Sequence, residues 1–358
     1  MPLTSYDFKN QVRDVVPILD YINQNNPKLV SKLMAGAEAK SKTHEWTEGI
    51  LGGKKVAGTA SGLTITVDDA AGLAVGMKIQ PVAAKDVYIV AAISGLAVTV
   101  TKLVDSMANP PAGKTTYKVY GAAVVSGSKT GEEVAWQGQT RLNYTQIFRK
   151  DATLTGSAVA TSTYDNANNM NTQVTNAMEL IQADLNFAIW HGRKALGSGT
   201  VAGTMGGLYE FCTKIVKDAE DAELTVDLIN AVIADITAAG GKPNTIVLPR
   251  AYAPKLSKLY EGQVIIGEDS TVRGMYVNKI KDAFGNILDV IYDDEVPMGH
   301  LWIMDITKVK LSPMVGRAFT DADSTPAGFD GFSRTIIGEY TLEVYNPDEC
   351  FGRIENLA

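Results

Sequence analysis

A helical pattern of thirty residues, at positions 165–194, limits what this chain can fold into more than any other feature. Apolar residues recur there at spacings of three and four, from Met170 to Ile189, which predicts one amphipathic α-helix. Asp165 is the expected N-cap, and Gly192 is expected to end the helix. At 1.5 Å per residue the helix would be about 45 Å long, which is long for a globular domain. Because its apolar face is only a stripe, we expect the other side to stay polar or to contact a neighbour.

Two stretches contain too few core residues to fold on their own. Residues 1–53 hold short helical phrases that two prolines interrupt, so we expect an N-terminal arm. Residues 121–163 are rich in Gly, Ser and Thr, and we expect an extended loop, with 141–148 and 152–158 as the two arms of a long hairpin. Both stretches would be stabilised by lying on another surface.

Residues 54–120 have a different pattern, in which short β-branched runs alternate with polar residues. Strands are predicted at 62–67 (GLTITV), 87–90, 95–100 (GLAVTV) and 117–120, divided by Gly and Asp. The spacing is typical of a small β-barrel or sandwich, inserted as a separate module. The phrases GLTITV and GLAVTV look alike, but two such short phrases are weak grounds for a repeat.

From residue 204 onward the pattern is mixed, so the predicted fold class is α+β. Amphipathic spacing predicts a helix over 228–236 that ends at Gly240, and Pro249 opens a further short helix through Leu259. Strands are expected at 245–248, 273–280, 287–292, 301–304, 309–311 and 335–344.

Length and charge restrict the function. A chain of 358 residues predicts about two or three packed units. The net charge of −7 argues against a dedicated nucleic-acid binder, although it is compatible with a container for nucleic acid. The N-terminus does not look like a signal peptide, and no run of about 18 apolar residues predicts a membrane span.

Two loops resemble nucleotide-binding motifs only loosely. Residues 108–115 match a loose P-loop expression, but two prolines remove amide donors and a strand pattern follows where a helix is needed. Residues 197–203 are glycine-rich but follow a helix and lack the GxGxxG spacing. We interpret both as connecting loops and predict no bound cofactor.

Reactive side chains are scattered along the chain. His44, His191 and His300 do not pair at metal-ligand spacing, and Cys212 has no recognisable base nearby. Cys350, near the C-terminus, is interpreted as a packing residue. Two cysteines are also too few for a disulfide framework, which suggests a reducing compartment.

Acidic clusters are the remaining candidates. Asp293, Asp294 and Glu295 adjoin, and Asp321 and Asp323 form a looser pair, but neither has the spacing of a dedicated calcium loop. We interpret them as solvated turns. The sequence therefore predicts no catalytic, cofactor-binding or metal-binding residue, and no enzyme.

An ordered series of phrases resembles a known family. The phrases are RLNYTQIF (141–148), LTGS (154–157), Tyr164-Asp165, a long helix with Glu179-Leu180, Gln182 and Asp184-Leu185, GGLY (206–209) and NTIVLP (244–249). Over residues 125–350 or so, their order is similar to the major head proteins of tailed bacteriophages, which have the Hong Kong 97 type capsid fold.

The resemblance implies a division of the chain. The expected parts are an N-terminal arm (1–53), an extended loop (121–163), a spine helix with the start of the peripheral domain (164–203), an axial domain (204–300), and peripheral-domain strands with the C-terminus (301–358). The β module at 54–120 departs from the minimal pattern of the family.

The resemblance also implies a function. It predicts a major capsid protein that self-assembles into pentamers and hexamers of an icosahedral head around double-stranded DNA. The chain would be part of the virion and would be assembled in the host cytoplasm. Portal, scaffold and decoration proteins are possible partners, and contact with packaged DNA would be diffuse and non-specific. No membrane partner is expected.

Two alternatives remain open at this point. An encapsulin-like bacterial nanocompartment shell shares the fold, but the inserted module and the extended first residues favour the phage protein. A soluble α+β enzyme would need convergent titratable groups, and the sequence offers none. We also expect that deleting residues 126–160 leaves a folded subunit that does not assemble.

Overall fold

The computed structural model describes residues 28–49, 55–70, 73–121, 138–161, 169–260 and 279–358. Contacts between Cα atoms divide the chain into two compact units, each described separately below. Unit 1 comprises residues 1–46 and 142–358, and unit 2 comprises residues 47–141, which interrupt unit 1 in the sequence.

Unit 2 contains a closed barrel of six antiparallel strands, which run β3-β4-β7-β6-β5-β8 around the ring. The strands are β3 (Lys55–Ser61), β4 (Thr64–Val67), β5 (Lys78–Pro81), β6 (Tyr88–Ser94), β7 (Ala97–Lys102) and β8 (Gly113–Tyr120). Alternate residues of β3, β4 and β7 are buried, as expected for strands with one face on a core. Their buried side chains, with Tyr88 and Tyr117, fill the interior. The closed ring leaves no free sheet edge among these strands.

Unit 1 contains two sheets. The first runs β1-β16-β18-β10, and β17 also pairs with β18. Its strands are β1 (Met34–Ala35), β10 (Gln146–Thr155), β16 (Val309–Pro313), β17 (Thr320–Asp323) and β18 (Gly331–Val344). The fourteen-residue β18 organises this sheet, because β10 pairs with its first ten residues, while β17 pairs with residues 334–337 and β16 with residues 340–344.

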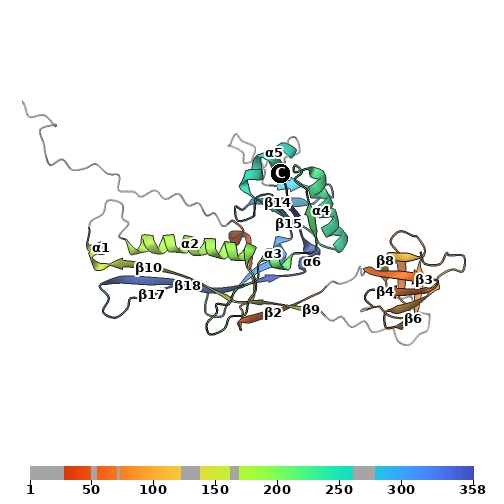
Figure 1. Cartoon of the computed structure of the whole chain (residues 1–358), viewed down its shortest axis with the longest axis horizontal. Helices are drawn as coiled ribbons and strands as arrows, with labels where there is room; N and C mark the ends of the chain where they lie inside the picture. Colours follow the sequence, from red (N-terminus) through yellow and green to blue (C-terminus); the bar gives the residue numbers. More distant parts are fainter. Residues whose placement is uncertain (1–27, 50–54, 71–72, 122–137, 162–168, 261–278) are drawn as a thin grey trace, which may run out of the picture. The chain divides into compact units, whose positions relative to one another are not determined.

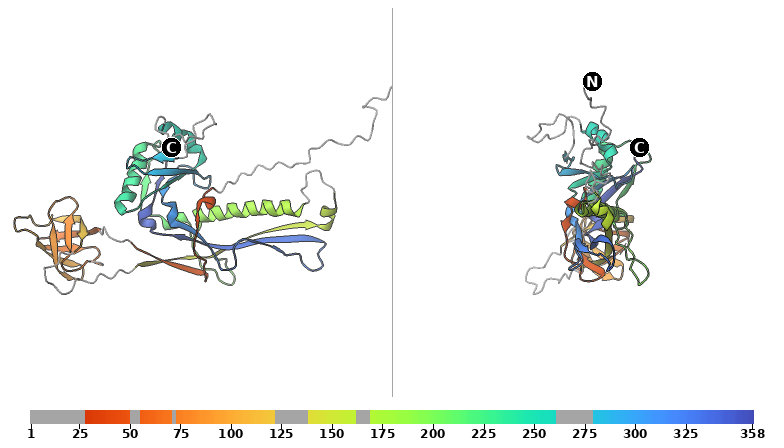
Figure 2. Two further views of the ribbon diagram at one scale, coloured as in Figure 1. Left: turned by 180° about the vertical axis from the view of Figure 1, so that it is seen from behind. Right: turned by 90° about the vertical axis from the view of Figure 1, so that its left-hand side faces the viewer.

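The long helix α2 (Met170–His191) packs on β10 and β18 and runs alongside them in both views (Figures 1 and 2). Asn169 caps it by accepting a hydrogen bond from the amide of Asn171, and Gly192 follows its last residue as predicted. The predicted cap, Asp165, lies outside the described residues. With 22 residues the described helix is about 33 Å long.

The second sheet of unit 1 is mixed and runs β11-β19-β15-β12-β14-β13. Its strands are β11 (Val216–Asp218), β12 (Thr245–Leu248), β13 (Lys279–Lys281), β14 (Ile287–Tyr292), β15 (Leu301–Met304) and β19 (Phe351–Glu355). The remaining helices of unit 1 are α1 (Gly156–Ala160), α3 (Leu208–Phe211), α4 (Val226–Ala239), α5 (Ala253–Leu259) and α6 (Pro347–Cys350), with short 3-10 turns η2 (Val30–Lys32), η3 (Arg250–Tyr252) and η4 (Ile306–Lys308). None of the helices in these described parts is long and apolar enough to cross a membrane.

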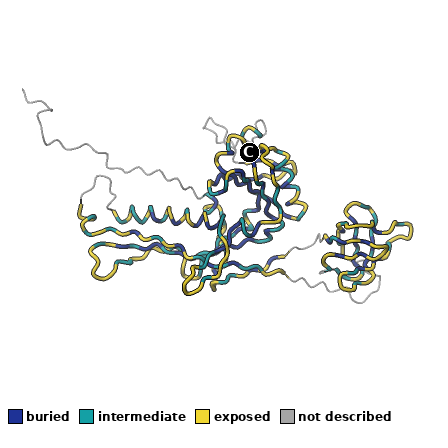
Figure 3. The backbone as a smooth tube through the Cα atoms, in the orientation of Figure 1, coloured by how far each residue is buried: buried dark blue, intermediate teal, exposed yellow. Residues whose placement is uncertain are grey.

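The central strands β12 and β15 are buried on both faces, which explains their uninterrupted apolar sequences. Ile246 and Ile303 face the core formed with α4. Val247 and Trp302 face the other way, into the core formed with the C-terminal half of α2. The sheet therefore separates two cores, and Figure 3 shows its central strands as continuously buried backbone.

Two expectations about pairing are wrong. Residues 141–148 and 152–158 do not form a hairpin, because β9 (Gln139–Tyr144) pairs with β2 (Thr43–Glu48) while β10 pairs with β18. Deleting 126–160 would thus remove a strand that pairs over ten residues and buries Phe148, so a folded remainder is not expected. The division at residue 300 is also wrong for the sheets, because β15 and β19 hydrogen-bond into the same sheet as β12.

The other predicted elements from residue 204 agree better with the structure. The helix predicted at 228–236 is α4, which Gly240 ends in the left-handed conformation with φ of 101°. The strand predicted at 245–248 is β12. The strand predicted at 273–280 lies mostly outside the described residues, and its last two positions begin β13. The prolines and apolar phrases of residues 1–27 also lie outside them.

Candidate functional site

The two nucleotide-like loops have no phosphate-binding geometry. Residues 108–115 run into β8, so a strand stands where a P-loop needs a helix N-terminus. Residues 197–203 form a loop closed by the backbone pair Ala195–Thr204, and Ser198 donates its amide to the carbonyl of Val201. Both are connecting loops, as predicted.

Two of the scattered histidines meet around one tyrosine. The ring of His191 stacks on Tyr209 with centroids 5.3 Å apart, and the Tyr209 hydroxyl lies 3.1 Å from Nδ1 of His300. Trp302 Nε1 donates to the same hydroxyl at 3.1 Å, and the guanidinium of Arg353 lies over the ring. Burial raises the pKa of Tyr209 to about 12 and lowers the pKa of His300. These groups are packed into the core and satisfy one another, so they form a structural cluster.

The remaining reactive groups in the described part of the chain do not form a reaction centre. Cys212 and Cys350 are thiols, not joined in a disulfide, and are buried in the same apolar core. Within the described residues, no group of three or more His, Cys, Asp or Glu side chains is arranged to hold a metal ion. Asp321 pairs with Arg334 at 2.7 Å, and Asp323 accepts hydrogen bonds from Thr325, as in an ordinary polar turn.

Asp293 differs from the predicted solvated turn. Its carboxylate is 1% exposed and accepts hydrogen bonds from the side chain of Asn186 in α2 (3.0 Å) and from two backbone amides, those of Leu29 (3.3 Å) and Glu295 (3.0 Å). A buried carboxylate is stable only when it is hydrogen-bonded in this way. Asp293 therefore fixes the chain at Leu29 to the long helix and to the second sheet.

A second buried carboxylate, Glu343 of β18, holds strand β2. His44 Nε2 of β2 lies 2.8 Å from Glu343 Oε1, Ser312 Oγ of β16 donates to that oxygen at 2.5 Å, and the Tyr345 hydroxyl donates to Oε2 at 2.9 Å. Burial alone would raise the pKa of Glu343, but these hydrogen bonds outweigh it and lower the pKa. The neighbouring Trp46 is buried against Phe211, so β2 is attached by a polar and an apolar contact.

Strand β9 is held in the same manner. The side chain of Asn143 is fully buried, donates to the carbonyls of Gly206 and Leu342, and accepts from the amide of Gly206 at 2.7 Å. Next to it, Thr145 Oγ1 donates to the buried Glu339 at 2.6 Å. The two-stranded ribbon formed by β2 and β9 is therefore fixed to unit 1 through both of its strands. Further along the ribbon, Arg141 of β9 pairs with Glu48 of β2.

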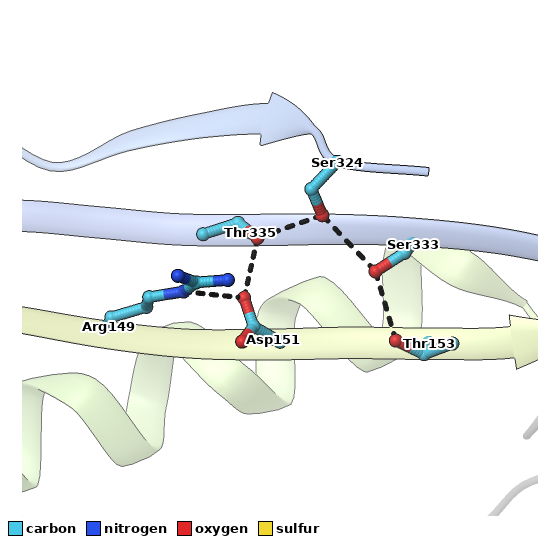
Figure 4. A network of polar contacts seen from close by, with 6 residues as sticks. All are labelled: Arg149, Asp151, Thr153, Ser324, Ser333 and Thr335. Atoms are coloured by element: carbon cyan, nitrogen blue, oxygen red, sulfur yellow. Dashed lines mark hydrogen bonds and ion pairs between the residues drawn. The ribbon is translucent and has the colours of Figure 1, made fainter. Parts of the chain in front are cut away.

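A polar network connects the strands of the first sheet on the face away from α2 (Figure 4). Thr335 Oγ1 of β18 donates to Asp151 Oδ1 of β10 at 2.5 Å and lies 2.8 Å from Ser324 Oγ. Arg149 Nε donates to the same carboxylate at 3.0 Å. The bonds from Thr335 and Arg149 lower the pKa of Asp151. The network continues through Ser333 and links the long strands without an apolar core on this face.

The polar groups with the greatest structural effect were missed in the sequence. Glu339, Thr341 and Glu343 occupy alternate positions of β18 and are all buried, so they form one polar face. The pattern E-x-T-x-E within an apolar strand was the available signal, because alternate residues of a strand share a face. The partner His44 could not be inferred, since it lies 299 positions away.

Solved structures share this fold. The chain aligns with the capsid of a native GTA particle at 9% identity and a TM-score of 0.54, covering 99% of this chain and 97% of that one. It aligns with structures from Mycobacterium phage Adephagia (10% identity, TM-score 0.52, 100% and 99% covered) and Mycobacterium phage Ogopogo (13%, 0.51, 100% of both). At such low identity the likeness concerns the fold, which is an α+β fold of the Hong Kong 97 capsid type. No curated protein matches the chain in sequence.

A match in sequence, and not the fold alone, places the chain in the class of capsid shell proteins. The sequence model of the SU10 major capsid protein family matches residues 2–358, and the chain belongs to that family. It is a structural capsid protein of a virion, not an enzyme, and its assembled form is a multimeric shell.

Proposed function

We propose that this capsid protein forms the pentamers and hexamers of an icosahedral phage head that encloses double-stranded DNA. The observation that carries the proposal is the family match over residues 2–358. Closed shells are held by many repeated contacts between identical subunits, so they need elements that reach beyond one subunit's core. The ribbon fits that requirement. The first sheet also fits it, because its long strands are linked largely by polar contacts.

The elements of unit 1 suggest how the parts of the fold are distributed. We assign α2 as the spine helix, with the first sheet as the peripheral domain. The second sheet with α4 and α5 is assigned as the axial domain. The ribbon of β2 and β9 takes the place of the extended loop, because its strands pair with each other and are fixed at one end by Glu343 and Asn143. This assignment replaces the loop expected at 121–163.

The barrel is interpreted as a module inserted into that extended loop, because β3 to β8 lie between β2 and β9 in the sequence. Residues 1–53 are interpreted as the N-terminal arm, whose described part is attached through Leu29 and β1. We propose that the barrel is exposed on the capsid surface and that the arm and ribbon overlap neighbouring subunits.

The partners follow from this function. Contact with packaged DNA is proposed to be diffuse and limited to phosphates, since a chain with a net charge of −7 must not bind its contents tightly. Portal, scaffold and decoration proteins are proposed as further partners, and assembly is proposed to take place in the host cytoplasm. An encapsulin-like compartment is the alternative, and isolation of native particles with their nucleic acid would distinguish the two.

The assembly proposal is tested with ribbon variants. Glu45 and Thr47 are exposed residues of β2 that alternate with the half-buried His44 and the buried Trp46 and Glu48. Changing both exposed residues to arginine should leave the melting temperature of unit 1 unchanged but reduce closed particles in negative-stain images. Changing the exposed barrel residues Thr59 and Asp105 to arginine together is the matched control and should assemble normally. Full assembly of the ribbon variant would contradict the role given to the ribbon.

A further inference from the structure

The barrel of unit 2 contains the same arrangement of three strands twice. Around the closed ring, β3, β4 and β5 have the same neighbours as β6, β7 and β8: exchanging the two sets converts every neighbouring pair of strands into another neighbouring pair. A ring with this property has an internal two-fold axis in its topology. Topology alone is weak support, because small antiparallel rings have few possible strand orders.

The residue pairing follows the same axis, which is a stronger condition. Two of the three pairs in the hairpin β3–β4 have an equivalent pair 33 positions later in the hairpin β6–β7. The equivalent pairs are Ser61–Thr64 with Ser94–Ala97, and Thr59–Thr66 with Ala92–Thr99. A register shift between Val90 and Ala92 changes the offset by one at the far end of β6.

The axis crosses the wall of the barrel between β4 and β7. Ile65 pairs there with Val98, which is its own equivalent. On the two sides of this pair, the amide of Val67 donates to the carbonyl of Leu96 (2.9 Å), and the amide of Val100 donates to the carbonyl of Leu63 (2.8 Å). Adding 33 to the donor Val67 of the first bond and subtracting 33 from its acceptor Leu96 gives Val100 and Leu63, the donor and acceptor of the second bond. The two bonds are therefore equivalent.

The opposite wall, between β5 and β8, has the same symmetry. Gln80 pairs with Lys118, and the pairs on its two sides are Ile79–Val119 and Pro81–Tyr117. An offset of 38 (118 minus 80) exchanges the last two pairs and leaves the first unchanged. Any antiparallel pair has such a local axis, so the offset of 38 is tested by the remaining pairs of strands. With an offset of 32 for β3 beyond the register shift, Val56–Tyr117 and Ala57–Thr116 become Tyr88–Ile79 and Ile89–Lys78, which are the observed pairs of β6 with β5.

The amino-acid sequences of the two halves of the barrel also agree, most clearly around the first turn of each half. Residues 61–67 read SGLTITV and residues 94–100 read SGLAVTV, with five of the seven positions identical. The glycine of each turn has a positive φ, 65° at Gly62 and 60° at Gly95, and neither has room taken up by neighbouring atoms. The offset rises from 33 in β7 to 38 in β8, which places five extra residues in the connection between β7 and β8, compared with the connection between β4 and β5.

We infer that residues 55–120 are a tandem duplication of one three-stranded unit, and that each unit carries a surface complementary to itself. The partner that this surface fits is a second copy of the same unit. In this chain the second copy is supplied in cis, by β6 to β8. A chain that kept only one unit should therefore bind another such chain and rebuild the barrel between them.

The test uses the full chain without residues 88–120, so that β3, β4 and β5 remain. Thr64 pairs with Thr99, whose equivalent is Thr66, so in the rebuilt barrel Thr64 of one chain faces Thr66 of the other. The bonds at Val67 and Val100 make this a non-hydrogen-bonded pair, with Cα atoms about 4.5 Å apart and within disulfide range. Thr64 and Thr66 are exposed, so cysteine is tolerated at both positions.

Single-unit chains with Thr64→Cys or with Thr66→Cys are oxidised separately and as an equimolar mixture, then run on a non-reducing gel. The mixture is expected to give covalent dimers several-fold above either chain alone, whether or not shells also form. The full-length Thr64→Cys/Thr99→Cys chain is the control and should close within one chain. If the control closes but the mixture gives no more dimer than the separate chains, the self-complementary surface does not exist.

A second measurement does not depend on the shortened chain folding. Thr64→Ala, Ile65→Val, Ala97→Thr and Val98→Ile together exchange the two motifs within the full-length chain. Equivalence of the two units predicts an unchanged melting temperature for unit 2, while Ile65→Val alone lowers it by leaving a small cavity. A fourfold variant that melts at or below the single variant would overturn the duplication.

Discussion

Replacing Asp293 with alanine should destabilise unit 1 strongly, because two buried donors and one part-buried donor lose their acceptor. These donors are the amides of Leu29 and Glu295 and the side-chain amide of Asn186, all within 3.3 Å of the carboxylate. A stranded buried donor costs about 1–3 kcal/mol, and with partial relaxation we expect a total of about 3–5 kcal/mol. For a unit of this size the loss corresponds to a fall in melting temperature on the order of 10 °C.

Differential scanning calorimetry of the Asp293→Ala chain measures this change, and Asp294→Ala is its control. Asp294 is about half exposed and pairs with Arg250 at 2.8 Å, so its loss should cost less than about 1 kcal/mol. Hydrogen exchange at the amide of Leu29 should rise in the first variant only. The reasoning fails if the two variants melt together, or if Leu29 keeps its protection without the Asp293 carboxylate.

Three further predictions concern acid stability and close packing. The pKa of Glu343 is lowered in the fold, so the carboxylate contributes fully to stability above the ordinary glutamate pKa of about 4.3, and this contribution is lost as the pH falls below that value. Glu343→Gln should therefore melt below wild type at pH 7, and the difference in melting temperature should narrow on acidification. A difference that does not depend on pH would contradict this. The pKa of His300 is lowered in the fold, so protonation favours the unfolded chain and stability falls as the pH drops below about 6.5. In the same melting assay, the melting temperature of His300→Asn should fall less than that of wild type between pH 7.5 and 5.5. A Cβ at Gly192 would lie 2.4 Å from two backbone carbonyl oxygens, so Gly192→Ala should lower the melting temperature by several degrees, while Gly199→Ala, where the space is open, should not.

Elements that depend on local pattern were predictable from the sequence. The long helix ended where Gly192 predicted, and the alternation in GLTITV and GLAVTV marks β4 and β7. Helix α4 and strand β12 were also predictable, since an amphipathic stripe and a short apolar run between turn residues are local signals.

Pairing between distant segments was not predictable in the same way. The phrase RLNYTQIF reads as one extended segment, but Thr145 separates β9 from β10, and the two strands join different sheets. Nothing local distinguishes a strand that pairs with its neighbour from one whose partner lies about 190 positions away. Asp293 was misread for the same reason, because its acidic neighbours suggest solvent while its partners Leu29 and Asn186 are remote in sequence.

The barrel illustrates how structure adds to a weak sequence signal. Two six-residue phrases were poor grounds for a repeat, whereas the registers of several pairs of strands in one ring must all agree with the same duplication. The same reasoning explains why the assembly surfaces are hard to read from one chain, since contacts between subunits leave no pairing within it.

Sedimentation velocity of the purified, concentrated chain tests the central claim most directly. The account predicts fast-sedimenting particles of megadalton mass, built from 38.3 kDa subunits and visible as closed shells in the same sample by electron microscopy. A single slow boundary at the mass of one subunit, at high concentration and with the ribbon and arm protected from protease, would contradict it.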